Sequence, residues 1–357
     1  MFHSYMDALA FHCLSRLKEE RTVYSALHII SGKKTSQTIQ DCHLFGLSAF
    51  FRTSPHLTRE AFDSCISRLA ESGYIRMKDA KGNYALDSSG EAALRDFSLS
   101  ERLPKHVNGF LYQDSPIMWQ RFSLLFQVLS NGVHQNKSYL PIQRDLAVQK
   151  WLKRFLYGRA KDFTSLAKEF HDELEQILAE LPELNAQVLM MRVSGYHRIG
   201  YSIEQISKKM DGDVWKVHYL FLDAFHYLLS RALSSPEAFP LLSEVAAEEE
   251  KQQSSTLTRS SSATLRYLKK GYGIEDIMKA RNLKRNTIED HIVEISLHIP
   301  GFNIEPYIDD ALLKHIRSLV RELDTKQLKV LKKNLPEEVT YFQIRLALAK
   351  GGDMHGA

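Results

Sequence analysis

The chain has 357 residues, of which 44% are hydrophobic and 25% charged, and its formal net charge is +4. These values are ordinary for a globular protein of two or three domains. The charge is too small for a protein that binds nucleic acid through net charge alone, so such binding has to come from local patches. No apolar run approaches the roughly 20 residues of a membrane span, and the first residues lack the basic segment of a secretory signal. We therefore expect a cytoplasmic protein with no membrane partner, associated with the nucleoid if it is bound to DNA.

The residues that usually carry chemistry are scattered. Cys13, Cys42 and Cys65 are far apart and odd in number, which fits a reducing compartment better than a disulfide framework. Neither a histidine motif for zinc, nor a Walker loop, nor a nucleophile elbow, nor a dinucleotide fingerprint is present. The sequence predicts no enzymatic activity, no metal, no cofactor and no small-molecule substrate.

Residues 1–90 predict several helices followed by a hairpin, the order of a winged-helix-like domain. In the segment from residue 57 to 73, Phe62, Ile66 and Leu69 lie on one helical face. Two short apolar segments then flank a turn at residues 81–83, which is typical of a β-hairpin. Two interpretations are open. Either the hairpin contacts DNA through Arg76, Lys78 and Lys81, or it is a surface hairpin with solvated charges, which the lack of an aromatic residue at the tip favours.

Residues 91–180 predict a helical region. It contains an apolar helix around residues 117–129 and a basic amphipathic helix over residues 142–158. The basic helix would be a phosphate-binding face, a partner-docking helix or simply a solvated surface. The basic residues of this stretch are Arg144, Lys150, Lys153, Arg154, Arg159 and Lys161.

Residues 181–235 resemble region 4 of bacterial sigma factors, a helix-turn-helix unit. The resemblance rests on Leu181, Pro182, Glu183, Val188, Leu189, Arg192, Gly200, Tyr201, Ser202, Ile203, Ile206 and Val217. The last helix departs from that family because it is apolar nearly all round, which is typical of a buried helix. We therefore interpret this unit as a degenerate helix-turn-helix used for packing or partner binding.

Residues 236–260 predict a flexible linker. The stretch contains prolines, the acidic run 248–250 and many serines, a composition that buries too little surface to become ordered. Its short apolar patch of Phe239, Leu241, Leu242 and Val245 would dock only transiently.

Residues 261–350 contain the most informative motif, a helix-turn-helix. Serines at 260–262 offer a helix cap, and Gly271 ends the first helix. Ile274, Ile277 and Met278 form the inner face of the second helix. Asn282 suits the left-handed turn that follows, and a third helix begins near Asn286.

A helix-turn-helix places the first residues of its third helix in the major groove. Lysine and arginine can read guanine there, and asparagine can read adenine. The candidate DNA-binding residues are Lys269, Lys270, Arg281, Lys284, Arg285, Asn286, Thr287 and His291. Glu289 and Asp290 would repel phosphate, so a tri-helical module that binds protein is the alternative.

The run from Gly271 to Ile295 resembles the helix-turn-helix domain appended to RecQ-type DNA helicases and their small partner proteins. The run from Leu328 to Ala349 resembles the closing segment of the same domain. Met278 and Asp290 depart from the family, which usually has a small residue and a glycine there. The resemblance implies a mainly α, multi-domain accessory protein of a RecQ-like helicase that binds the helicase, DNA or both in repair or recombination. The alternative is a helix-turn-helix transcription regulator.

Overall fold

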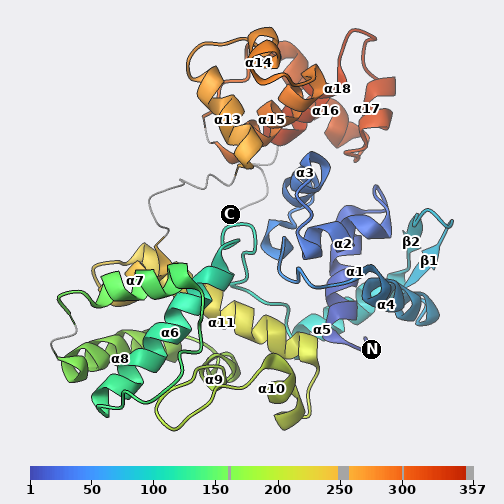
Figure 1. Ribbon diagram of the computed structural model, residues 1–357. Coiled ribbons are helices and arrows are strands. Elements are labelled where there is room, and N and C mark those ends of the chain that lie inside the picture. The colour runs from blue at the N-terminus through green and yellow to red at the C-terminus, as the bar shows by residue number, and fades with distance from the viewer. Residues whose placement is uncertain (160–161, 248–256, 300, 351–357) are drawn as a thin grey trace. The chain divides into compact units, whose positions relative to one another are not determined.

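The computed structural model describes residues 1–159, 162–247, 257–299 and 301–350. In these ranges lie 18 α-helices, one 3-10 helix and one two-stranded antiparallel sheet (Figure 1), which confirms the prediction of a mainly α protein. The chain divides into two compact units. Unit 1 comprises residues 1–8 and 97–250, and unit 2 comprises residues 9–96 and 251–357. Each unit therefore joins stretches that the sequence places far apart.

The first part of unit 2 has the element order expected of a winged-helix-like unit: helices, then a helix and a hairpin. The helices α1 and α5, at its two ends, each cross a unit boundary. The elements are α1 (Tyr5–Leu17), α2 (Val23–Ser31), α3 (Ser36–Leu44), the 3-10 helix (Ser48–Phe50), α4 (Arg59–Glu71), β1 (Ile75–Met77), β2 (Tyr84–Leu86) and α5 (Ser88–Ser100).

The hairpin turn is fixed against the beginning of α2. Gly82 has a φ of +92°, a conformation that suits glycine, and a Cβ there would lie 3.0 Å from the ring of Tyr24. The backbone N–H of Val23 donates to the carbonyl of Gly82 at 2.9 Å. Inside the turn, the Asp79 carboxylate accepts from the backbone N–H groups of Lys81 and Asn83. The turn is thus held both by contacts with α2 and by hydrogen bonds within the turn itself.

Unit 1 is a helical assembly around one hydrophobic core. Its remaining helices are α6 (Ser115–Val133), α7 (Leu146–Leu156), α8 (Phe163–Ala179), α9 (Glu183–Met191), α10 (Ile203–Lys209), α11 (Val214–Ser234) and α12 (Pro240–Ala246). The longest, α11, packs against α9, α10, α12 and α8. Its residues Val217, Phe221, Phe225 and Leu228 are buried. The third helix of the sigma-like unit is therefore a core helix, as its all-round apolar pattern predicts.

Buried polar side chains of α11 hold the segment that precedes α6. The Asp223 carboxylate accepts from the backbone N–H of His106 at 2.6 Å and from the side-chain amide of Asn185 at 2.9 Å. The Nδ1 atom of His226 accepts from the backbone N–H of Asn108 at 3.0 Å. These contacts satisfy backbone groups that would otherwise be buried without partners.

The linker predicted over residues 236–260 is not linker throughout. Residues 240–246 form α12, whose Leu242 and Val245 are fully buried in the core of unit 1. The buried carboxylate of Glu173 on α8 accepts from the backbone N–H of Leu241 at 3.0 Å and of Leu242 at 2.9 Å. The composition of this stretch predicted disorder because it takes no account of distant partners. The residue that stabilises α12, Glu173, lies almost 70 residues earlier in the sequence. Residues 248–256, with the acidic run, lie outside the described residues.

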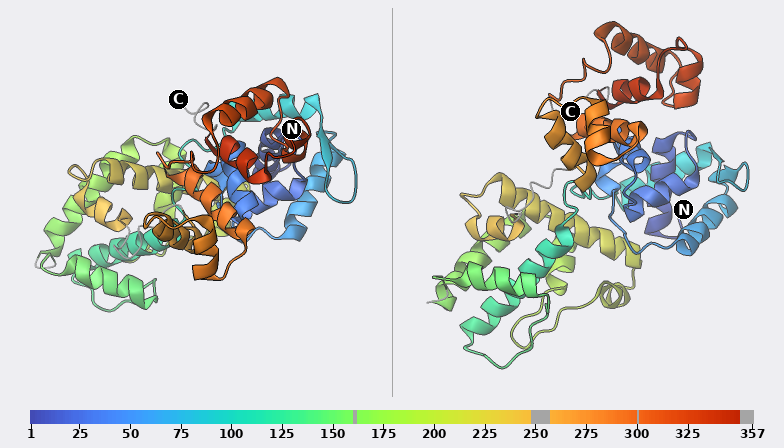
Figure 2. Two further views of the ribbon diagram at one scale, coloured as in Figure 1. Left: turned by 90° about the horizontal axis from the view of Figure 1, so that it is seen from above. Right: turned by 45° about the horizontal axis from the view of Figure 1, so that its top comes forward.

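The second part of unit 2 contains six helices that stay grouped in every view (Figures 1 and 2). They are α13 (Arg259–Leu268), α14 (Ile274–Arg281), α15 (Arg285–His298), α16 (Asp310–Glu322), α17 (Leu328–Lys333) and α18 (Tyr341–Lys350). α15 lies at the centre, since it packs against α13, α14, α18 and also α3.

None of the described helices combines the length and the hydropathy that a bilayer crossing requires.

Candidate nucleic-acid interface

The helix-turn-helix of α13, α14 and α15 follows from local sequence signals. The Thr258 hydroxyl accepts from the backbone N–H of Ser261 at 3.2 Å, so α13 begins earlier than the serines at 260–262 suggested. Gly271 adopts a φ of +83° after α13. Asn282 adopts a φ of 50° and a ψ of 49° at the end of α14, as predicted. This left-handed residue sets the direction in which the chain enters α15.

Most of α15 is core. Ile288, Ile292 and Val293 have no exposed surface, and every residue from His291 to Ser296 is buried. The fully exposed residues of α15 lie in its first turn, whereas Glu289, Asp290, Leu297 and His298 are half-buried. A contact to nucleic acid through α15 would therefore mainly use that turn. We call this surface the exposed turn, defined as Lys284, Arg285, Asn286 and Thr287. Lys284, Arg285 and Asn286 are exposed and Thr287 is half-buried.

The exposed turn also presents the positive end of the helix dipole. Lys284 is the residue before the first helical position, and none of the described ion pairs involves it. A helix N-terminus with a nearby cation favours an anion such as phosphate. The exposed turn therefore has the local chemistry of a phosphate contact.

The acidic residues around the exposed turn are paired with cations. Arg285 forms ion pairs with Glu275 on α14 and with Glu289 one turn later, the second at 3.4 Å. Asp290 forms an ion pair with Arg345 on α18. Glu289 and Asp290 thus repel phosphate less than their sequence positions suggested. The same pairing makes Arg285 less available for a base than an unpaired arginine would be.

Two of the predicted DNA-binding residues, His291 and Arg281, are turned inward towards α13, and the burial of His291 contradicts a DNA contact by that residue. His291 is buried, and its Nδ1 lies 2.8 Å from the hydroxyl of Thr264, which has no exposed surface. Burial, with a smaller contribution from Arg281, lowers the pKa of His291 to about 4. The imidazole is therefore neutral near pH 7 and cannot attract phosphate.

Arg281 is the second inward residue. Its guanidinium donates to the carbonyl oxygen of Ser260 at 2.9 Å and to the Ser260 hydroxyl at 3.1 Å. It also donates to Thr264. These bonds join α14 to α13, and burial lowers the pKa of Arg281. Sequence spacing placed both residues near the motif but could not show that α13 would cover them.

A surface hollow of about 390 Å³ lies beside this inward cluster. Its lining comprises Ala263, Arg266, Tyr267, Lys270 and Arg281, with no acidic side chain among them. We call it the basic hollow. Arg266 and Lys270 are exposed. Arg281 also lines the hollow, and its guanidinium is hydrogen-bonded to Ser260 on α13. The sequence prediction included Lys270 and the exposed Lys269 but missed Arg266 and Tyr267, one turn earlier on α13. Their helical spacing from Lys270 was the available signal.

The hairpin carries three exposed cations, one of which is paired. Arg76, Lys78 and Lys81 are exposed, and Lys78 forms an ion pair of 2.7 Å with Glu19. Hydrogen bonds from Lys78 and from the backbone of Leu86 lower the pKa of the Glu19 carboxyl. Gly82 of the hairpin turn is held against α2, which favours the surface-hairpin interpretation.

The basic helix predicted over residues 142–158 is α7, which spans Leu146–Leu156. Its apolar face is part of the core, since Val148, Trp151 and Phe155 are buried. Its other face leaves Lys150 and Lys153 exposed. Docking through the apolar face is therefore excluded, while phosphate binding by the basic face stays a prediction. Arg159 pairs with Glu244 at 2.8 Å, and Lys161 lies outside the described residues.

Groups that could hold a metal are sparse in the part of the chain that the structure describes. His171, Asp172 and Glu175 on α8 come within 4.8 Å of one another, and all three are exposed. Exposed acidic groups of this kind are common without an ion. Cys13, Cys42 and Cys65 are buried thiols. Burial raises the pKa of the Cys13 thiol to about 12, which makes it a poor nucleophile.

Comparison with known proteins agrees with this geometry. A family described as a helix-turn-helix domain matches residues 260–348, which places α13 to α18 in that family and suggests a function related to nucleic acid. No solved structure matches the chain. The chain is 33% identical over 351 residues to Protein YpbB from Bacillus subtilis (strain 168), and the match covers 97% of each of the two chains. The chain therefore belongs to the YpbB family of helix-turn-helix proteins.

Proposed function

We propose that the protein is a non-enzymatic accessory protein of a RecQ-like DNA helicase, which binds the helicase, DNA or both during repair or recombination. The observation that carries the DNA part is the helix-turn-helix with an exposed basic first turn on α15 and a basic hollow on α13. The helicase part is supported by the resemblance of residues 271–295 and 328–349 to the domain appended to RecQ-type helicases.

The electrostatics suit weak, backbone-directed binding to DNA. Lys284, Arg266 and Lys270 are exposed cations. If each of these three residues contacts one phosphate, a plot of the logarithm of the affinity against the logarithm of the salt concentration has a slope of about −2.7. The affinity would then fall roughly 40-fold between 50 and 200 mM salt. Binding of this strength becomes useful when a second attachment holds the domain near DNA, because a tether gives an effective concentration of about millimolar.

The DNA part is tested by fluorescence anisotropy with the full chain on single-stranded, duplex and forked DNA at two salt concentrations. Lys284→Gln, Arg266→Gln and Lys270→Gln should each weaken binding and each reduce the salt slope by about one. Lys329→Gln removes an exposed charge of the same domain elsewhere and should leave DNA affinity almost unchanged. Equal losses in all four variants would show a nonspecific charge effect and would contradict the assigned surfaces.

The helicase part needs a separate experiment. The full chain is mixed with the RecQ-like helicase of the same organism, and the two are followed by size-exclusion chromatography at low salt. Co-elution that survives nuclease treatment would support a direct complex. Separate elution at micromolar concentrations would sink the helicase part and leave the DNA part to stand on the anisotropy results.

A transcription regulator is the second candidate, and the exposed Asn286 favours it, since asparagine can read adenine. Such a regulator usually dimerises to read two half-sites. A sequence-selective footprint on duplex DNA, lost in Asn286→Ala, would favour regulation. Binding that depends on DNA form and not on sequence would favour the accessory function.

A further inference from the structure

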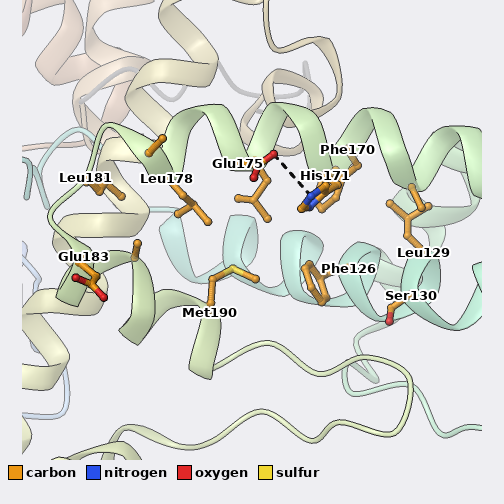
Figure 3. A pocket seen from close by; sticks show the side chains of 14 residues that line it. Phe126, Leu129, Ser130, Phe170, His171, Glu175, Leu178, Leu181, Glu183 and Met190 are labelled. Atoms are coloured by element: carbon orange, nitrogen blue, oxygen red, sulfur yellow. Dashed lines mark ion pairs between the residues drawn. The ribbon is translucent and has the colours of Figure 1, made fainter.

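Unit 1 contains an apolar groove that the proposed DNA contacts do not use. It lies between α8 on one side and α6 and α9 on the other, and its volume is about 700 Å³. Figure 3 shows the side chains of α8 facing those of α6 and α9 across it. Ten of its fourteen lining residues are hydrophobic, among them Phe126, Leu129, Phe170, Leu174, Leu178 and Met190.

The groove has a buried floor and half-buried walls. Leu129, Phe170 and Leu174 are buried, whereas Phe126 and Met190 are half-buried. The floor is therefore part of the core of unit 1, and the walls expose apolar surface to solvent. An unbranched methionine in such a wall adapts to the shape of a bound side chain.

The length of the groove fits a bound helix better than a compact small molecule. The lining residues of α8 extend from Ala167 to Ala179 at spacings of three and four residues, a distance of about 18 Å at 1.5 Å per residue. A helix of about 12 residues has the same length. Helices that bind in grooves present apolar residues at i, i+3, i+4 and i+7, which matches the spacing of this wall.

The charged residues of the lining are mostly acidic. Glu175 and Glu183 line the groove, together with His171, and no lysine or arginine does so. Both carboxylates are exposed. Asp172 lies beside His171 and Glu175, with ligand atoms of the three residues within 4.8 Å. The Nε2 atom of His171 lies 3.8 Å from a carboxylate oxygen of Glu175. Three carboxylates, those of Asp172, Glu175 and Glu183, outnumber this one histidine, so the border of the groove is negative.

We propose that this groove docks an amphipathic helix of a partner protein, with three turns of apolar residues on one face and lysines or arginines on the flanks. The apolar face would bury the half-exposed walls, and the basic flanks would meet Glu175 and Glu183. This inference goes beyond the proposed function and does not depend on DNA binding. It identifies the partner by chemistry, a basic amphipathic helix.

The experiment uses the full chain and three synthetic 14-residue peptides with a fluorescent label. The first has leucines at i, i+3, i+4, i+7 and i+11 and lysines on both flanks. The second has the same composition with the leucines scattered around the helix, and the third has glutamates in place of the lysines. We expect micromolar binding of the first peptide and at least tenfold weaker binding of the other two.

Three variants, two of them double substitutions, distinguish binding in the groove from general electrostatic attraction. Glu175→Lys combined with Glu183→Lys should weaken the first peptide at least tenfold at low salt. Glu169→Lys combined with Glu237→Lys makes the same charge change at exposed positions outside the lining and should change the affinity less than twofold. Ala179→Trp adds bulk at an exposed lining position and should block binding while the circular dichroism spectrum stays unchanged.

Three results would overturn the proposal. Equal binding of the first and second peptides would show attraction by charge without a groove. Equal effects of the two double variants would place the contact elsewhere on unit 1. Binding of the apolar dye Nile red that Ala179→Trp abolishes, with no binding of any peptide, would assign the groove to a small apolar ligand.

Discussion

His226 makes a sharp prediction about the stability of unit 1. The imidazole is only 1% exposed, and its Nδ1 accepts from the backbone N–H of Asn108 at 3.0 Å. Burial lowers the pKa of His226 to about 3, whereas an unfolded histidine has a pKa of about 6.5. The unfolded chain therefore binds the proton first as the pH falls. Stability that is present above pH 6.5 is lost progressively between pH 6.5 and 3.

The size of this loss follows from the two pKa values. At pH 5 the imidazole is still neutral in the folded protein but protonated in the unfolded chain. Since pH 5 lies 1.5 units below the unfolded pKa, the free energy of unfolding is lower by about 2 kcal/mol. His226→Asn keeps an acceptor at the position of Nδ1 and removes the titration. We expect its free energy of unfolding to fall by about 2 kcal/mol less than that of the wild type between pH 7 and pH 5.

Urea unfolding followed by tryptophan fluorescence measures this difference. The tryptophans of the chain, Trp119, Trp151 and Trp215, all lie in unit 1, so the signal reports the unit that contains His226. His197→Asn is the matched control, because His197 is exposed and its φ of 51° is one that asparagine tolerates. If wild type, His226→Asn and His197→Asn all lose the same stability, the buried imidazole is not the cause and the reasoning fails.

Three further predictions concern helix ends and turns. Glu173→Ala should leave the backbone N–H groups of Leu241 and Leu242 without their acceptor and lower the free energy of unfolding by about 1–3 kcal/mol. Residues 240–246 should then become cleavable in limited proteolysis, and unchanged protection would contradict the anchoring of α12. Asn282→Ala should destabilise unit 2 by about 1 kcal/mol in thermal unfolding, while Asn282→Gly should not, because the position is left-handed. Gly82→Ala should lower the melting temperature of unit 2, because φ is +92° and the new Cβ meets Tyr24; an unchanged or higher value would show that the turn is not held against α2.

Several features of this protein are local, and the sequence predicted them for that reason. Helical periodicity identified the core faces around Phe62 and Ile277, and turn residues located the hairpin between β1 and β2. Asn282 marked the turn before α15 because its left-handed conformation depends on its own backbone. The apolar surface of α11 predicted burial without reference to its neighbours.

Tertiary contacts decided the rest, because they join residues that the sequence separates. His291 and Arg281 are polar residues of a helix-turn-helix motif, and only the packing of α13 over them shows that they face Thr264 and Ser260. Glu275 reduces the availability of Arg285 from ten residues away. Glu173 orders α12 within a stretch whose composition indicated disorder.

The division into units is also a tertiary property. Residues 9–96 and 251–357 form one compact unit although more than 150 residues separate them, since α3 packs against both α15 and α18. Hydrophobic periodicity shows that a helix has an apolar face, but it does not show which other face covers it. The sequence by itself thus determined the elements and the motif, while the side chains available for function depended on which surfaces the tertiary contacts covered.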